Sequence, residues 1–199
     1  MTQTKKPEVK QAILKSAYHL FRKKGYASTT TAQIAKLANV SESNVYVYFE
    51  SKAQVLFAIY DPWLRDRITK LKRELEHVPA PRARLRLILK LLWQELPSED
   101  GGFSNNLMQC LSTLTGPDHY KSDLLSWVEE NIEIMLLSCV PKHRREKLKQ
   151  GRLVHILMMA QDGFVMNYHL ATKNRGNKQS SELMCDFILG PERRKAVSR

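Results

Sequence analysis

Apolar residues recur every three or four positions along most of the chain, which is the spacing of one face of an amphipathic helix. The first such face consists of Ile13, Ala17, Leu20 and Phe21, and Gly25 follows it as a stop signal. No stretch alternates apolar and polar residues between turn signals, as a half-buried strand would. The pattern predicts an all-α protein of nine helices without a sheet.

Capping and helix-breaking residues set the ends of these helices. Thr30 and Gln33 have the spacing of a capping box, and Ser41 and Ser51 are good N-caps. Asn39 tolerates the left-handed conformation that a tight turn requires. The helices are expected at residues 7–24, 30–38, 41–48, from 51 onward, 81–96, 103–114, 118–139, 144–171 and 178–189.

Pro62 interrupts the apolar pattern of the fourth helix. Proline removes a backbone donor and its ring clashes with the preceding turn, so we expect a kink or a break there. Because this helix joins the first fifty residues to the rest, the bend is either a regulatory hinge between these two parts or a fixed feature without a regulatory part. Both readings remain open.

Two of the predicted helices are short and joined by a tight turn, which is a helix-turn-helix pattern. In this motif the start of the second helix faces base edges in the major groove. Ser43 and Asn44 suit base contacts there, and Val47 suits a thymine methyl group. Tyr46 and Tyr48 offer hydroxyls to bases or phosphates; the alternative is that their rings mainly pack.

Charge strengthens the DNA-binding interpretation. The formal net charge is +12 and the isoelectric point is about 9.7. The first 52 residues hold nine Lys and Arg against three acidic residues, so the motif lies in the most basic quarter of the chain. Thr30, Thr31 and Lys52 lie at helix N-termini, which favour phosphate. Short helical pairs are common in proteins. It is the position of this pair in the most basic quarter of the chain that indicates DNA binding.

The stretch from Gly25 to Lys52, with the preceding Leu20 and Phe21, resembles the N-terminal domain of the TetR family of transcriptional regulators. The elements Gly-Tyr, Thr-Thr, Ile-Ala, Val-Ser, Tyr-x-Tyr-Phe and Ser-Lys all occur at family spacing, over about residues 10–60. In departures from the family pattern, Asn39 stands where Gly is usual, Val47 where His or Arg is frequent and Glu50 where Pro or Lys is frequent. These departures leave the operator sequence unpredictable by analogy.

The resemblance implies an all-α homodimer. It implies a helix-turn-helix DNA-binding domain over 1–52 and an effector-binding and dimerisation domain over 53–190. The residues themselves indicate a basic tail over 191–199. It also implies a sequence-specific regulator, by family default a repressor that a small hydrophobic or amphipathic effector releases from a near-palindromic operator. The DNA contacts that it carries over are Thr30, Ser43, Asn44, Tyr46, Val47, Tyr48 and Lys52.

The last two predicted helices, 144–171 and 178–189, resemble the dimerising pair of the family, although the same residues can also form intramolecular core. An effector pocket is expected among the fourth to eighth helices, since Met and aromatic residues suit an adaptable apolar cavity. Each residue taken singly is more often simple core. The candidates are Phe57, Trp63, Leu92, Trp93, Met108, Leu111, Trp127, Met135, Met158 and Asp162.

Other function classes find little support. Cys110, Cys139 and Cys185 lie far apart in apolar runs, which favours buried free thiols in a reducing cytoplasm. No signal segment or membrane-spanning run is present. The histidines have no metal-ligand spacing, and no Walker loop, nucleophile elbow or Cys-x-x-Cys occurs, so we expect no enzyme, metal or cofactor. The alternatives are an activator, or an adaptor that docks a protein through the basic stretch 142–149.

Overall fold

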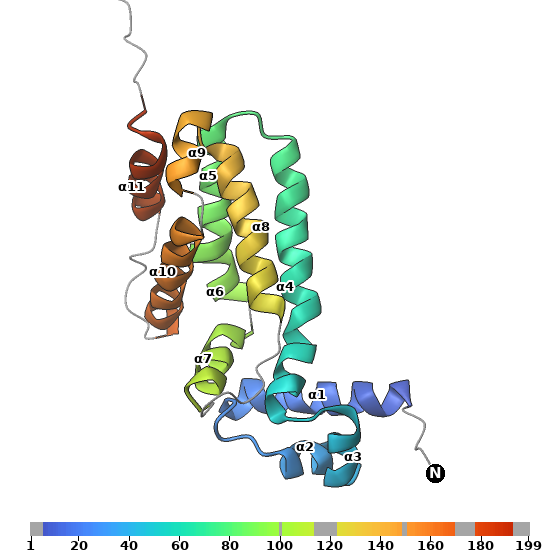
Figure 1. The fold of residues 1–199 in the computed structure, drawn as a ribbon. Helices are drawn as coiled ribbons and strands as arrows, with labels where there is room; N and C mark the ends of the chain where they lie inside the picture. The colour runs from blue at the N-terminus through green and yellow to red at the C-terminus, as the bar shows by residue number, and fades with distance from the viewer. Residues whose placement is uncertain (1–5, 100, 114–122, 149–150, 170–177, 193–199) are drawn as a thin grey trace, which may run out of the picture. The chain divides into compact units, whose positions relative to one another are not determined.

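The computed structural model describes residues 6–99, 101–113, 123–148, 151–169 and 178–192 (Figure 1). All regular structure in these residues is helical, as the apolar pattern predicts. The helices are α1 (Pro7–Lys24), α2 (Thr31–Leu37), α3 (Glu42–Tyr48), α4 (Lys52–Glu76), α5 (Pro81–Lys90), the π-helix η1 (Leu91–Glu95), α6 (Leu96–Glu99), α7 (Phe103–Thr113), α8 (Asp123–Cys139), α9 (Lys142–Leu148), α10 (Arg152–His169) and α11 (Lys178–Leu189).

Two long predicted helices are divided in the structure. The prediction of one helix over 144–171 is wrong: Gly151 separates α9 from α10. Gly151 has φ +70°, and its N–H donates to the Glu133 carboxylate at 2.9 Å instead of continuing a helical ladder. The predicted helix 81–96 also changes form, because a π-helical turn follows Lys90. Of the predicted helix 118–139, residues 118–122 lie outside the described part of the chain.

Pro62 lies inside α4, which continues past it to Glu76. Proline has no N–H for the Ala58 carbonyl, so one helical hydrogen bond is missing at this point. The helix does not break at Pro62, whose side chain is exposed. The expected kink stays a prediction.

The chain forms two compact units. The first comprises Met1–Asp66 and Asp100–Leu124, and the second comprises Arg67–Glu99 and Leu125–Arg199. The first unit therefore contains α1 to α3, the first part of α4 and α7. This division by compactness differs from the predicted ranges, which end the DNA-binding domain at residue 52, because α7 packs with the N-terminal helices.

In the first unit, α1 packs on α2 and α2 packs on α3 (Figure 1). Its core includes Ile13, Phe21, Ile34 and Leu56, whose side chains are almost completely buried. The α1 and α2 members come from the apolar faces that the sequence predicts. Burial of these faces fixes the short helices, which are too short to be stable alone.

In the second unit, α11 packs on α5, and α10 packs on η1 and α6. Leu85, Ile88, Leu92, Ile132 and Leu157 are fully buried in its core. No helix in the described ranges is both long and apolar enough to cross a lipid bilayer.

All three cysteines, one in the first unit and two in the second, are free and buried, as the sequence predicts.

Candidate nucleic-acid interface

The start of α2 is fixed by a complete capping box. The Thr30 hydroxyl accepts the Gln33 N–H at 3.2 Å, and the Gln33 amide oxygen accepts the Thr30 N–H at 3.0 Å. The same amide oxygen also accepts a hydrogen bond from the Lys24 ammonium. This confirms the cap that the sequence predicts and sets the end of α2 that precedes the recognition helix.

The turn between α2 and α3 has the geometry that the sequence requires. Asn39 has φ +55°, and it alone among the described non-glycine residues has a positive φ. Its N–H donates to the Lys36 carbonyl at 3.3 Å, and the Val40 N–H donates to the Ala35 carbonyl at 3.0 Å. Asparagine therefore takes the left-handed position that glycine usually fills, and the helix-turn-helix geometry is retained.

The recognition helix α3 begins with a capped turn and leaves polar side chains accessible. The Ser41 hydroxyl accepts the Asn44 N–H at 3.2 Å and lies 2.8 Å from the Ser43 hydroxyl. Val45 is buried in the core of the first unit, whereas Ser43 is exposed and Asn44 is half-buried. The first turn of α3 thus presents short polar groups and buries only its apolar side.

Two tyrosines of α3 connect it to neighbouring segments. Tyr46 is 51% exposed, and its hydroxyl lies 3.2 Å from the Thr31 hydroxyl. Tyr48 is half-buried, and its hydroxyl accepts the backbone N–H of Lys6 at 2.7 Å, at the start of α1. Tyr46 therefore remains open to a ligand, whereas Tyr48 ties the basic N-terminal segment to the recognition helix.

Thr31 and Val47 are less accessible than Thr30 and Ser43. The Thr31 hydroxyl donates to the Glu42 carboxylate at 2.5 Å, which engages its only hydrogen. Val47 is half-buried, and Thr30 is exposed.

The side-chain ammonium of Lys52 is bound to the turn between α1 and α2. Its ammonium donates to the carbonyls of Tyr26 and Thr29 at 2.8 and 2.7 Å, and lies 4.0 Å from the centre of the Tyr26 ring. Burial lowers the pKa of Lys52, although the nearby Cys110 opposes that shift. The sequence places Lys52 at a helix N-terminus facing phosphate, but its charge is engaged by the turn between α1 and α2.

Two residues of α7 contact the same turn, and nothing in the local sequence pattern indicates them. The Gln109 amide oxygen accepts the Ala27 N–H at 2.9 Å. Cys110 is fully buried and lies beside the Tyr26 hydroxyl. Burial, with the Cys110 contact, raises the pKa of Tyr26 far above the usual value for a phenol.

The predicted effector candidates are divided between the two units. Phe57, Trp63, Met108 and Leu111 belong to the first unit, and the other six belong to the second. In the second unit, Trp93 is buried, donates to the Leu157 carbonyl at 3.4 Å and packs 4.8 Å from Phe164 between ring centres. The described cavities, a groove of about 540 Å³ and a recess of about 110 Å³, are lined by other residues of that unit. The effector pocket thus stays a prediction.

The described helices and the helix-turn-helix define an all-α protein with a DNA-binding type of head. The sequence model of "Bacterial regulatory proteins, tetR family" matches residues 13–59, which include α2, α3 and their turn. These residues therefore carry the N-terminal domain of the TetR family, and the solved structures support a TetR-like fold for the rest of the chain.

Relatives and solved structures are consistent with this match. The regulator YuxN of Bacillus subtilis is 29% identical over 89 residues, which are 45% of this chain and 31% of that protein. The match to the first curated relatives spans less than half of their length. A TetR regulator of Haloarcula marismortui superposes with TM-score 0.65 and 22% identity, covering 91% of this chain and 98% of that one. FadR of Bacillus subtilis, solved with stearoyl-CoA, superposes with TM-score 0.60 and 14% identity, covering 92% of this chain and 99% of that one. These structures support the fold.

Proposed function

We propose that the chain is a sequence-specific DNA-binding transcriptional regulator that acts as a homodimer. The observation that carries this proposal is the capped, exposed first turn of α3 within a basic helix-turn-helix head. A dimer would place two such helices in successive major grooves of a near-palindromic site, about 34–36 Å apart. By family default the protein represses transcription, and it acts in the cytoplasm.

The roles of single residues follow from their accessibility. Ser43 and Asn44 face bases from the first turn of α3, Val47 supports an apolar contact, and Tyr46 reaches a base or phosphate. Thr30 lies at the start of α2, where backbone N–H groups favour phosphate. Since the Lys52 ammonium is engaged, we assign the phosphate contact at this position to the backbone N–H groups of the first turn of α4. Their assignment to DNA rests on geometry and residue type.

Dimerisation through α10 and α11 is supported by their exposed apolar side chains. Ile156 and Met159 on α10 are 56% and 62% exposed, and Leu183 and Phe187 on α11 are 58% and 74% exposed. The members of each pair lie three or four residues apart, which puts them on one helix face. Large exposed apolar residues arranged in this way favour burial against a second copy.

The effector proposed for the second unit is a small hydrophobic or amphipathic molecule. FadR of Bacillus subtilis, which shares the fold, was solved with stearoyl-CoA, a ligand of this kind. The aromatic pair Trp93 and Phe164 provides an apolar wall of the type that such ligands contact. An effector would favour a conformer with the wrong spacing of the two heads, which requires unequal affinity for the two conformers.

A second candidate function is supported by the 540 Å³ groove at one end of the second unit. Its lining includes the apolar residues Val140, Pro141 and Leu189. The charged residues that line it are Arg82, Lys142, Arg145 and Glu192, so basic residues are in excess. This combination suits an acidic, apolar segment of a partner protein, as the adaptor alternative requires. Charge reversal of Lys142 that leaves regulation intact would remove support for this alternative.

The first test is a titration of the purified protein against the DNA that flanks its own gene and against a shuffled duplex, at two salt concentrations. A specific regulator is expected to prefer the native fragment about 10³-fold or more and to keep much of that preference as salt rises. Equal, steeply salt-dependent binding to both duplexes would send the search for the operator elsewhere in the genome. A folded dimer that binds neither duplex, with and without candidate effectors, contradicts the proposal.

A further inference from the structure

The turn between α1 and α2 depends on side chains from distant parts of the sequence. Gly25 begins the turn and Thr30, the N-cap of α2, follows it. Inside the turn, the Thr29 hydroxyl donates to the Gly25 carbonyl at 2.8 Å and the Thr29 N–H donates to the Tyr26 carbonyl at 3.1 Å. The Ala27 N–H bonds Gln109, which lies 82 residues further along the chain. The position of this turn is therefore not set by local sequence alone.

Gln109 fits closely against this turn. A Cβ atom added at Gly25 would lie 2.9 Å from the Gln109 amide oxygen, so the side chain already fills the space beside Gly25. The Gln109 amide nitrogen donates to the Asn105 side chain at 3.4 Å, one turn earlier on α7. This second bond orients the amide, so that its oxygen faces Ala27.

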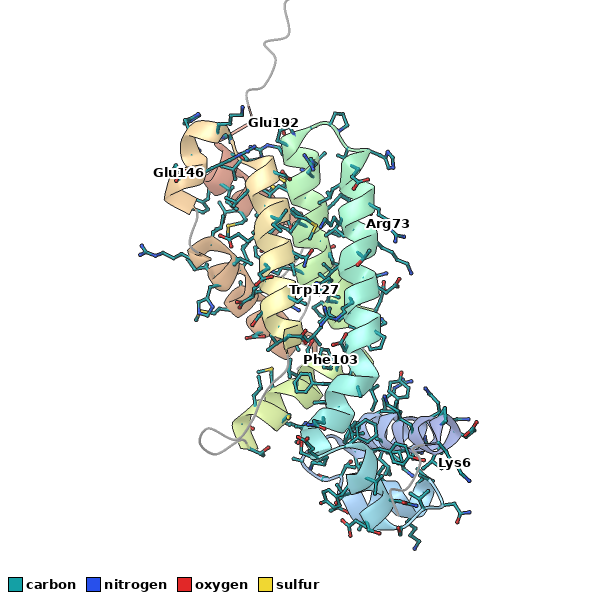
Figure 2. The ribbon with its side chains drawn as sticks, turned by 45° about the vertical axis from the view of Figure 1, so that its right-hand side comes forward. Lys6, Arg73, Phe103, Trp127, Glu146 and Glu192 are labelled. Atoms are coloured by element: carbon teal, nitrogen blue, oxygen red, sulfur yellow. The ribbon has the colours of Figure 1, made fainter. Side chains whose placement is uncertain are left out.

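Aromatic packing within the first unit holds α7 in place. Phe103, labelled in Figure 2, begins α7 and stacks on Tyr60 of α4 at 4.2 Å between ring centres. Tyr60 in turn packs 6.2 Å from Tyr18 of α1, and Trp63 meets Phe103 edge-on at 6.5 Å. The helix that carries Gln109 is thus anchored to the two helices that flank the helix-turn-helix.

We propose that Gln109 is a positioning residue for DNA recognition, which rests on the function proposed above. Its amide oxygen fixes the Ala27 N–H and so sets the turn that leads into Thr30 and α2. Because α2 packs on α3, a displaced turn changes how the recognition helix meets the groove. A shift of α7 would reach the recognition helix through the same hydrogen bond.

The test compares Gln109→Met with Gln109→Glu. Methionine keeps the length of the side chain but has no amide acceptor, whereas glutamate keeps an acceptor for Ala27. Ser112→Ala, at an exposed position on the same helix, is the matched control. The first readout is hydrogen exchange of the Ala27 amide. The second is affinity for a duplex selected in vitro with the wild-type protein and for its shuffled counterpart.

Loss of one such hydrogen bond corresponds to about a fivefold change or more. Gln109→Met is expected to raise Ala27 exchange and to lower affinity for the selected duplex by at least this factor, with shuffled-duplex binding unchanged. Gln109→Glu is expected to keep Ala27 protected, and Ser112→Ala to match wild type in both readouts.

Several results would overturn the inference. Unchanged Ala27 protection in Gln109→Met shows that the bond does not hold the turn. Equal losses on both duplexes show a general loss of folded protein instead of a positioning defect. If wild type and Gln109→Met bind the selected duplex equally, only this inference is overturned. If the wild-type protein prefers no duplex at all, the proposed function is overturned and this inference with it.

Discussion

Lys52 matches a family DNA contact, and in this structure its ammonium also has a structural role. Its ammonium bonds two carbonyls of one turn. Lys52→Met leaves both carbonyls without this donor, and hydrogen bonds from a charged group contribute about 1.5–3 kcal/mol, so we expect the free energy of unfolding to fall by about 2 kcal/mol. Urea unfolding measures this change, with the exposed Lys36→Met as control, expected within about 0.5 kcal/mol of wild type. If Lys52→Met is as stable as wild type but binds DNA more weakly, Lys52 is instead a phosphate contact.

Tyr26 couples the stability of the head to alkaline pH. Its pKa is raised in the folded protein, mainly by burial, so the folded state holds the phenol proton where the unfolded chain releases it. The stability that depends on this proton is complete below the unfolded pKa of about 10 and is lost as pH rises above it, by about 1.4 kcal/mol per pH unit.

The control for this prediction is Tyr26→Phe, which keeps the ring but cannot ionise. Between pH 9 and 11, urea unfolding should show the free energy of unfolding falling faster for wild type than for Tyr26→Phe. Any extra stability that the Tyr26 hydroxyl gives wild type through its contact with Cys110 should disappear over this range. Parallel curves would mean that Tyr26 ionises freely in the folded protein.

Along the helices, periodicity and capping residues carry most of the information about the fold. Thr30, Ser41 and Asn39 signal their structures locally, because each satisfies or permits a backbone geometry within a few residues. The end at Gly151 has a weaker local signal, since its N–H donates to Glu133 on another helix.

The contacts of the candidate site with α7 could not be predicted from sequence for a related reason. The Gln109 amide has no periodic or motif signature, and its partner Ala27 is ordinary in composition. Only folding of α7 onto the head brings them together. Local patterns therefore predict the recognition helix, but not the packing that holds the preceding turn.

Pro62 tests what the long helix α4 requires. Pro62→Ala restores an N–H for the Ala58 carbonyl and removes the clash of the ring with the preceding turn. Since proline in a helix interior costs about 3 kcal/mol relative to alanine, the variant is expected to raise the free energy of unfolding by up to that amount. Thermal and urea unfolding measure the gain.

The same variant separates a hinge from a fixed bend. Once an effector is known, Pro62→Ala with an unchanged effector response counts against the hinge, and a lost response with wild-type operator affinity supports it. A variant less stable than wild type would show that α4 needs the local geometry that proline provides.

For the assembled protein, the main question is what covers the exposed apolar faces of α10 and α11. Phe187 exposes 74% of its surface and Met159 exposes 62%, although residues of this kind are normally buried. Burial of a large apolar side chain contributes about 1.5–3 kcal/mol, and a symmetric interface counts each residue twice. A homodimer through these helices therefore has a clear driving force.

Phe187→Glu tests this interface. The substitution removes the apolar side chain and places a charge on each subunit at the interface. A loss of about 2 kcal/mol of dimerisation free energy per subunit weakens dimerisation by about 10³-fold. Sedimentation equilibrium measures this shift, and circular dichroism checks that the monomers keep their helices. The control is Ile134→Glu on α8, which is 57% exposed but lies on neither proposed helix. Dissociation by Ile134→Glu, with Phe187→Glu still dimeric, would move the interface to α8. If Phe187→Glu alone dissociates, specific affinity for a two-half-site operator should fall with it, because each head then binds without the second.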